Sequence, residues 1–353
     1  MVAALAAVLA LVAAVLVAGG RFGWFSDPLI SGAPEAHADV EVVATGLVAP
    51  WDLAFLPDGT ALVTERDSAR LLAVNGAGAV REVARITQAS PGGEGGLLGV
   101  AVSPDYPTDG RIYLYYTTAD DNRIARIRLA GDGVATRPEP VLTGIPRART
   151  HNGGRIAFGP DGMLYAGTGD AGDRDAAQDH TSLAGKILRL TPEGAPPADN
   201  PFAGSTVFSL GHRNVQGLDW GPDGDLFASE FGQDRHDELN RVRAGGNHGW
   251  PVVEGVAGLA DYVDPVATWA TRDASPSGIA FHGGRIWLAC LRGQRLYRVT
   301  AQGEQAETLL SGTYGRLRHA ATAPDGTLWV LTSNRDGRGS PAADDDRILR
   351  ITG

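Results

Sequence analysis

Polar residues of types that do chemistry stand beside glycines at several points in this chain. His151 lies in THNGGR, with arginines and small residues around it, at the start of an apolar run. A neutral imidazole can accept a proton from a hydroxyl group near neutral pH, so His151 is a candidate general base. A surface histidine without a role is the alternative, because the chain has eight histidines.

Arginine, amide and carbonyl groups gather in later segments. GHRNVQGL places Arg213 beside Asn214, two donors suited to an anionic or carbonyl-bearing ligand. SEFGQDRHDELN and GGNHGWP combine carboxylates, amides and glycine-associated carbonyls, the oxygen ligands that Ca²⁺ prefers. Arg292 follows an apolar strand, and alternation puts Arg316 and Arg318 on one face of another. Solvated loops and surface salt bridges are the alternatives.

Two glycine-rich segments need separate interpretation. In PGGEGGLLG the glycines allow close backbone approach to a ligand, and Glu94 is the one side chain there able to do polar work. GTGDAG matches a dinucleotide fingerprint, but an acidic, broken segment follows it instead of a helix. We interpret the acidic residues of that segment as a solvated loop; they are Asp170, Asp173, Asp175 and Asp179.

A repeated hairpin pattern predicts the fold that positions these groups. Two apolar runs flank a Pro-Asp-Gly turn in IAFGPDGMLYAG, and related turns precede the strands ALVTE, RIYLYY, DLFASE, RIWLA and TLWVLT. Repeats of roughly 40–50 residues with several strands each are typical of β-propellers. We predict an all-β, six-bladed β-propeller, with a β-sandwich as the alternative. The last strand, near 346–351, is expected to pair with the first, near 40–43, and close the ring.

Composition supports one all-β domain and excludes some partners. The 353 residues include 48 glycines and 21 prolines, and the net charge is −10 with no basic cluster. Nucleic acid is therefore not an expected partner. The single cysteine, Cys290, lies in an apolar strand and is expected to be a small buried hydrophobe.

The amino-terminal segment indicates export. Residues 1–20 are apolar and uncharged, long enough for a signal peptide or a membrane anchor. Residues 36–38, Ala-His-Ala, have the form of a cleavage site but lie far downstream, so cleaved signal and uncleaved anchor both stay open. Residues 21–38 are expected to be a linker, and 39–353 the propeller. We predict an extracytoplasmic protein, secreted or anchored to the membrane.

The motifs in combination resemble a known family. EGGLLGVAVSPDY, THNGGRIAFGPDGMLYAGTGD, LGHRNVQGL, SEFGQDRHDELNRVRAGGNHGWP and GRLRHAATAPDG are similar to the soluble quinoprotein glucose dehydrogenases and aldose sugar dehydrogenases. The resemblance runs from about residue 40 to the carboxyl terminus. It implies a six-bladed propeller that binds pyrroloquinoline quinone (PQQ) and Ca²⁺ and oxidises aldoses at C1.

The resemblance also implies a role for each matching residue. His151 would take the C1 hydroxyl proton, and Arg213 with Asn214 would contact the reactive carbonyl region of the quinone. The remaining expected roles are main-chain ligation of the cofactor's Ca²⁺ by Gly232 and Gln233, ligation of a second, structural Ca²⁺ by Glu238 and the His248 carbonyl, and cofactor binding by Glu94, Arg292, Arg316 and Arg318.

Three positions depart from the family pattern. Glu94 stands where the glucose enzymes have glutamine, and Arg292 stands where a lysine binds the cofactor. Thr150 replaces an aspartate, which leaves His151 without an adjacent carboxylate. Strict glucose specificity is therefore not expected.

These inferences favour a PQQ- and Ca²⁺-dependent oxidoreductase that converts aldoses to lactones and passes electrons to an external acceptor. A non-catalytic propeller that binds a carbohydrate or a protein is the alternative. A propeller hydrolase such as a lactonase would need Ca²⁺ ringed by side-chain carboxylates and amides in the tunnel. Joint presence of His151, Arg213, Asn214, Arg316 and Arg318 favours the dehydrogenase.

Overall fold

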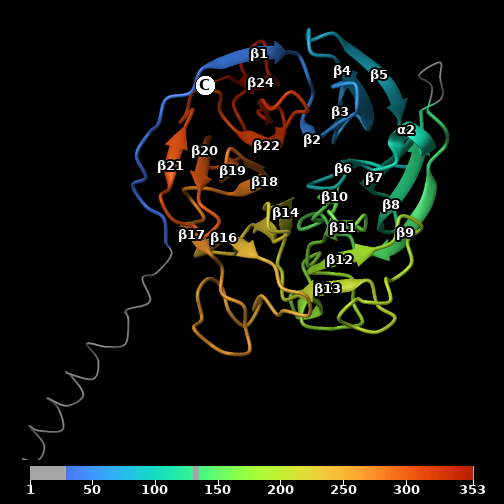
Figure 1. Ribbon diagram of the computed structural model, residues 1–353, viewed down its shortest axis with the longest axis vertical. Helices are drawn as coiled ribbons and strands as arrows, with labels where there is room; N and C mark the ends of the chain where they lie inside the picture. The colour runs from blue at the N-terminus through green and yellow to red at the C-terminus, as the bar shows by residue number, and fades with distance from the viewer. Residues whose placement is uncertain (1–28, 130–134, 353) are drawn as a thin grey trace, which may run out of the picture.

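Six antiparallel sheets of four strands each stand in a ring around a central axis (Figure 1). A computed structural model describes residues 29–129 and 135–352. The predicted six-bladed β-propeller is confirmed. Residues 1–20, predicted as a signal or anchor, lie outside the described residues, and no helix within the described part is long and apolar enough to cross a membrane.

The strands follow one another around the ring, and in each blade the first strand of a group lies nearest the axis (Figure 1). The first three blades contain β2 (Pro50–Phe55), β3 (Ala61–Glu65), β4 (Arg70–Val74) and β5 (Val80–Arg85); β6 (Leu97–Val102), β7 (Arg111–Thr117), β8 (Asn122–Arg128) and β9 (Glu139–Ile145); and β10 (Ile156–Phe158), β11 (Leu164–Gly167), β12 (Lys186–Leu190) and β13 (Val207–Leu210). The last three contain β14 (Val215–Trp220), β15 (Leu226–Glu230), β16 (His236–Arg241) and β17 (Ala267–Ala270); β18 (Pro276–His282), β19 (Arg285–Cys290), β20 (Arg295–Val299) and β21 (Glu307–Leu309); and β22 (Leu317–Thr322), β23 (Leu328–Thr332), β24 (Ile348–Ile351) and β1 (Val40–Ala44).

The Pro-Asp-Gly turns join the first two strands of a blade, as predicted. In three blades the turn aspartate accepts a hydrogen bond from the amide two residues ahead: Asp58 from Thr60 at 2.9 Å, Asp161 from Met163 at 3.1 Å and Asp325 from Thr327 at 3.0 Å. This is the local bonding that makes aspartate a turn residue. The second blade differs, because a short helix, α2 (Tyr106–Asp109), occupies its turn.

The two ends of the propeller domain meet in one sheet. Strand β1 pairs antiparallel with β24, with Val40 opposite Ile351 and Val42 opposite Leu349. In Figure 1 the blue strand β1 accordingly lies beside the red strand β24. This pairing confirms the predicted closure, and it removes the unpaired edges that an open ring would leave. Residues 29–38 run along the outer strands, where the amides of Ile30 and Ala36 donate to the carbonyls of Thr268 and Thr308.

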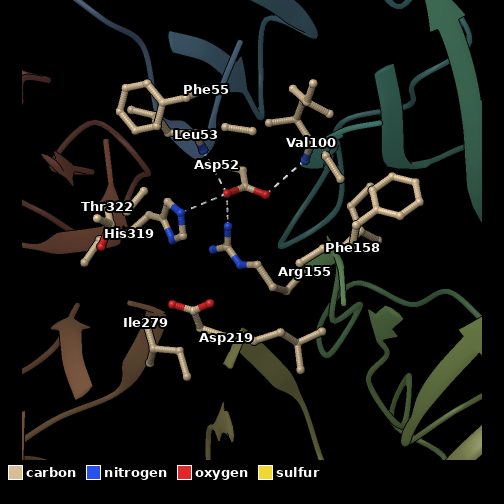
Figure 2. A pocket seen from close by; sticks show the side chains of 18 of the residues that line it. Asp52, Leu53, Phe55, Val100, Arg155, Phe158, Asp219, Ile279, His319 and Thr322 are labelled. Atoms are coloured by element: carbon tan, nitrogen blue, oxygen red, sulfur yellow. Dashed lines mark hydrogen bonds and ion pairs between the residues drawn. The ribbon is translucent and has the colours of Figure 1, made fainter. Parts of the chain in front are cut away.

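A central tunnel runs along the axis of the propeller, and a layer of polar side chains, Asp52, Arg155 and His319, closes it partway. Asp52, Arg155 and His319 each stand six residues before the aspartate of a turn, so equivalent innermost positions bring them together. Asp52 pairs with Arg155 and lies 3.3 Å from His319 Nε2 (Figure 2). On one side of this layer the tunnel widens into a cavity of about 490 Å³ that extends to the turns at the far face.

Candidate active site

His151 and Asp170 meet at one end of the third blade's first hairpin. His151 precedes β10 and Asp170 follows β11, and the two strands are antiparallel, so both residues lie at the same end of the sheet. His151 Nδ1 is 2.7 Å from Asp170 Oδ1. The contact holds the imidazole in one orientation, and with Nδ1 as the donor it leaves Nε2 as the free basic nitrogen.

The carboxylate of Asp170 is almost wholly buried and has two further donors. The indole Nε1–H of Trp250 donates to Oδ2 at 2.9 Å, and the amide of Gly172 donates to Oδ1 at 2.8 Å. Burial alone raises the pKa of Asp170, but the contacts with His151, Gly172 and Trp250 outweigh it and lower this pKa below its usual value. Asp170 is therefore an anion poised to stabilise a protonated imidazole.

The interpretation of Asp170 as part of a solvated loop is wrong. The expectation that His151 lacks a carboxylate partner is also wrong. Thr150 has no carboxylate, but Asp170, from the other side of the hairpin, provides one. The hairpin gave a partial indication: the segment before its first strand and the segment after its second strand lie at the same end of the sheet. Asp173, in contrast, is exposed.

Arg213 and Asn214 lie at the same end of the ring as His151. The amide of Asp170 donates to the Arg213 carbonyl at 2.8 Å, and the amide of Gly153 donates to Asn214 Oδ1 at 3.0 Å. The Arg213 guanidinium donates to Gln233 Oε1 at 2.6 Å and lies 5.4 Å from the ring centre of Trp250. Asn214 Nδ2 is buried without a hydrogen-bond partner, a donor that a bound carbonyl or ring nitrogen would satisfy.

A cluster of arginines lines a cavity on this face of the polar layer. Arg316 and Arg318, both 8% exposed, border it together with Arg66, Arg338 and the carboxylates of Glu94 and Asp336. Asp336 pairs with Arg316 at 2.8 Å. Arg66 and Arg338 belong to segments that the sequence reasoning did not single out.

The guanidinium of Arg318 has no carboxylate partner among the described residues. It stacks on Trp51, with its carbon 4.6 Å from the ring centre. Burial and the neighbouring arginines lower its pKa well below the usual value. A buried guanidinium without an ion-pair partner, among other arginines, fits a ligand that carries negative charge.

Arg292 is placed differently from the other predicted cofactor residues. Its side chain is exposed in the turn that follows β19 and takes no hydrogen bond or ion pair within the part of the chain that the structure describes. The neighbouring Leu291 borders the arginine-lined cavity, and Arg292 does not.

The loop from Gly232 to His236 can present carbonyl oxygens to a cation. The amides of Gln233, Asp234, Arg235 and His236 all donate to Glu254 Oε1, at 2.9 to 3.1 Å. The N–H and C=O of a trans peptide point in opposite directions, so the carbonyls of Gly232 and Gln233 point away from Glu254. Neither carbonyl accepts a hydrogen bond from the described residues, which fits both for Ca²⁺ ligation.

Glu238 and His248 lie in a second small cavity nearby. Glu230 faces Glu238 across the paired strands β15 and β16, and Asn240 Nδ2 donates to both carboxylates, at 2.8 and 3.1 Å. Burial raises the pKa of Glu230, and burial together with the charge of Glu230 raises the pKa of Glu238. Two buried carboxylates need a proton or a cation between them.

Unpaired polar atoms surround this carboxylate pair. Asn240 Oδ1 and both ring nitrogens of His248 are buried without hydrogen-bond partners. His212 Nδ1 lies 2.9 Å from Glu230 Oε1, and the His212 ring stacks on His248. Burial lowers the pKa of His212 to about 3, so this contact is a hydrogen bond from a neutral imidazole and not an ion pair. The donor set fits a cation at Glu238.

Neither a metal-ligand cluster nor the cavity beyond the polar layer marks the site within the described residues. No group of three or more His, Cys, Asp or Glu side chains able to hold a metal occurs in the described ranges. Ca²⁺ held mainly by carbonyl oxygens does not require one. The cavity of about 490 Å³ lies on the other side of the polar layer, whereas the arginine-lined cavity is bordered by Glu94, which accepts the amide N–H of His151.

Fold and site together define a propeller with a histidine–aspartate pair beside an arginine-lined cavity on one face of the ring. Residues 47–349 match the family described as Glucose / Sorbosone dehydrogenase, and the chain belongs to that family. A PQQ-bound aldose sugar dehydrogenase from Streptomyces coelicolor has 51% sequence identity, covers 90% of this chain and 99% of its own, and superposes with a TM-score of 0.86.

Curated relatives extend over most of the domain. The aldose sugar dehydrogenase YliI of Escherichia coli K12 is 31% identical over 90% of this chain and 97% of its own length. Quinoprotein glucose dehydrogenase B of Acinetobacter calcoaceticus is 31% identical over 71% of this chain and 61% of its own length. The resemblance seen in the motifs is confirmed.

Proposed function

We propose that this protein is a PQQ- and Ca²⁺-dependent dehydrogenase that oxidises aldoses at C1 to lactones and passes the electrons to an external acceptor. One observation carries the proposal: the His151–Asp170 pair and the unpaired Arg318 lie on the same side of the polar layer, at the face that also bears Arg213. A general base thus adjoins a binding place for a polyanion. Family membership and the PQQ-bound relative support the same conclusion.

Bound PQQ with Ca²⁺ would supply the hydride acceptor and the Lewis acid, since no amino-acid side chain accepts hydride. Arg316 and Arg318 would hold its carboxylates, and the Gly232 and Gln233 carbonyls its Ca²⁺. Asn214 Nδ2, buried and unpaired, supplies one more donor for the ring. Glu238 and the His248 carbonyl would hold the second Ca²⁺.

The chain's own residues carry the proton. Oxidation of the C1 hydroxyl removes a hydride from carbon and a proton from oxygen, and His151 Nε2 would take the proton. Asp170 would stabilise the imidazolium through Nδ1–H, and Trp250 would keep the Asp170 carboxylate in place. Arg213 would stabilise negative charge that develops on the acceptor side of the site.

The proposal extends to location. The apolar segment 1–20 supports export to an extracytoplasmic compartment, where sugars and soluble or membrane-bound electron acceptors are both accessible.

The decisive experiment uses the full chain reconstituted with PQQ and Ca²⁺. We expect reduction of an artificial dye on addition of aldoses, with the C1-oxidised lactone detected by ¹³C NMR and no activity without cofactor. Absence of dye reduction across a panel of mono- and disaccharides would remove the enzyme proposal.

A further inference from the structure

The glycine-rich turn that carries Glu94 is pressed against the backbone just before His151. Gly92 and Gly95 exchange hydrogen bonds at 3.1 and 3.0 Å, which makes the turn tight. A Cβ on Gly93 would lie 2.1 Å from the Arg149 carbonyl oxygen, so only glycine permits this approach. The amide of Glu94 donates to that same carbonyl at 2.8 Å. This tight turn places Glu94 directly against the segment that contains His151.

Both carboxylate oxygens of Glu94 are engaged by this chain. Oε2 accepts the amide N–H of His151 at 2.8 Å, and Oε1 accepts Arg338 Nη2 at 2.9 Å. The Glu94 side chain is 20% exposed, whereas that of Arg338 is 57% exposed. Burial raises the pKa of Glu94, but the His151 amide and Arg338 outweigh it, so Glu94 is ionised at neutral pH.

The backbone of His151 has a positive φ, a strained conformation that contacts with other residues must stabilise. Its φ is 57°, in the left-handed region that a residue with a Cβ occupies at a cost of about 1–2 kcal/mol. Its carbonyl accepts the Ala171 amide at 3.1 Å, its Nδ1 contacts Asp170 and its amide is bonded to Glu94. Every polar atom of His151 except Nε2 is therefore fixed, and among the described residues Glu94 is the one side chain that bonds to its backbone.

We propose that Glu94 is a positioning residue that holds the peptide of His151 in this left-handed conformation and so aims Nε2, with Arg338 as the partner that neutralises its charge. This inference rests on the proposed function only in taking His151 as the base. It gives Glu94 a role different from the cofactor contact that the family resemblance implies.

The choice of glutamate matches Arg338. A glutamine at this position could still accept the His151 amide through its carbonyl oxygen, but its NH₂ would then face the Arg338 guanidinium, donor against donor. A carboxylate accepts from both. The bond to His151 and the bond to Arg338 can therefore be separated by substitution.

Four variants of the full, reconstituted chain test the proposal. Glu94→Ala and Glu94→Ser remove both bonds, Glu94→Gln keeps the bond to His151, and Glu139→Ala is the matched control in an exposed pair with Arg126. We expect kcat to fall about 30-fold in the first two, less than about 5-fold in Glu94→Gln, and not at all in the control. KM and the Kd for PQQ, from titration of the cofactor-free protein, should change less than about 3-fold.

Hydrogen exchange supplies a readout independent of turnover. The His151 amide should exchange at least about tenfold faster in Glu94→Ala and Glu94→Ser than in the parent or in Glu94→Gln, with melting curves showing that each variant is folded. Unchanged exchange, unchanged kcat, or a Kd for PQQ weakened as much as kcat would overturn the positioning role. An inactive parent protein would instead count against the proposed function, and the exchange measurement would still decide the role of Glu94.

Discussion

Asp170→Asn is the substitution that best distinguishes an effect on the proposed proton transfer from an effect on the fold. The two side chains have nearly the same shape, so the change removes the negative charge beside His151 Nδ1 with little change in volume. In the parent protein Asp170 accepts from three groups: the imidazole at 2.7 Å, the Trp250 indole at 2.9 Å and the Gly172 amide at 2.8 Å. An asparagine has one acceptor oxygen, so its NH₂ must face at least one donor.

The size of the effect follows from the lost negative charge on the acceptor of the His151 hydrogen bond. A hydrogen bond to a charged group contributes roughly 1.5–3 kcal/mol, and the bond to His151 strengthens as the imidazole becomes protonated in the transition state. At about 1.4 kcal/mol per tenfold change in rate, kcat should fall between about 10- and 150-fold. KM should change much less, because Asp170 is almost wholly buried and out of reach of a sugar.

Steady-state dye reduction with saturating PQQ, Ca²⁺ and aldose gives kcat and KM separately. Asp173→Asn is the control, since Asp173 is an exposed aspartate three residues further along the same loop. A kcat for Asp170→Asn within threefold of that for Asp173→Asn would refute the reasoning, because His151 would then be oriented by something else.

Three further outcomes are expected. Arg318→Met should weaken PQQ binding in a titration of the cofactor-free protein by at least about 10-fold, since it removes the unpaired guanidinium on Trp51; unchanged binding would contradict this. Burial raises the pKa of Asp219 to about 6, so in the folded protein this carboxyl holds a proton from about pH 4 to 6 that it has lost in the unfolded chain; as the pH rises through that range, the free energy of unfolding of the parent should fall by about 3 kcal/mol relative to that of Asp219→Asn. Denaturant unfolding across pH measures this, and parallel pH profiles would contradict it. Added Ca²⁺ at about 100 times its Kd should stabilise the parent by roughly 2.7 kcal/mol, and an equal shift of the melting temperature in Glu238→Gln would exclude Glu238 as a ligand.

The fold was predictable because its signal is local and repeated. Each turn motif sits between two short apolar runs, and the structure turns each of these into the first hairpin of a blade. Closure through β1 and β24 was predictable as well, because an open ring leaves edges. The helix α2 in the second blade's turn was not, since Pro and Asp serve turns and helix starts equally.

The site was predictable only in part, because its contacts join segments far apart in the chain. His151 and Arg213 stand in motifs that can be recognised by themselves. Asp170 looked like one acidic residue among several until the hairpin placed it against His151. The bond between Glu94 and Arg338 joins residues 244 positions apart, and no local pattern encodes such a pair.

The most direct test of the account is anaerobic reduction of the bound cofactor. Protein reconstituted with PQQ and Ca²⁺ is mixed with an aldose, and the cofactor's absorbance is followed through a single turnover in the parent and in His151→Ala. The account predicts rapid reduction in the parent and a rate at least about 100-fold lower in the variant, at equal cofactor content. Equal rates in the two proteins, or no reduction in the parent, would contradict it.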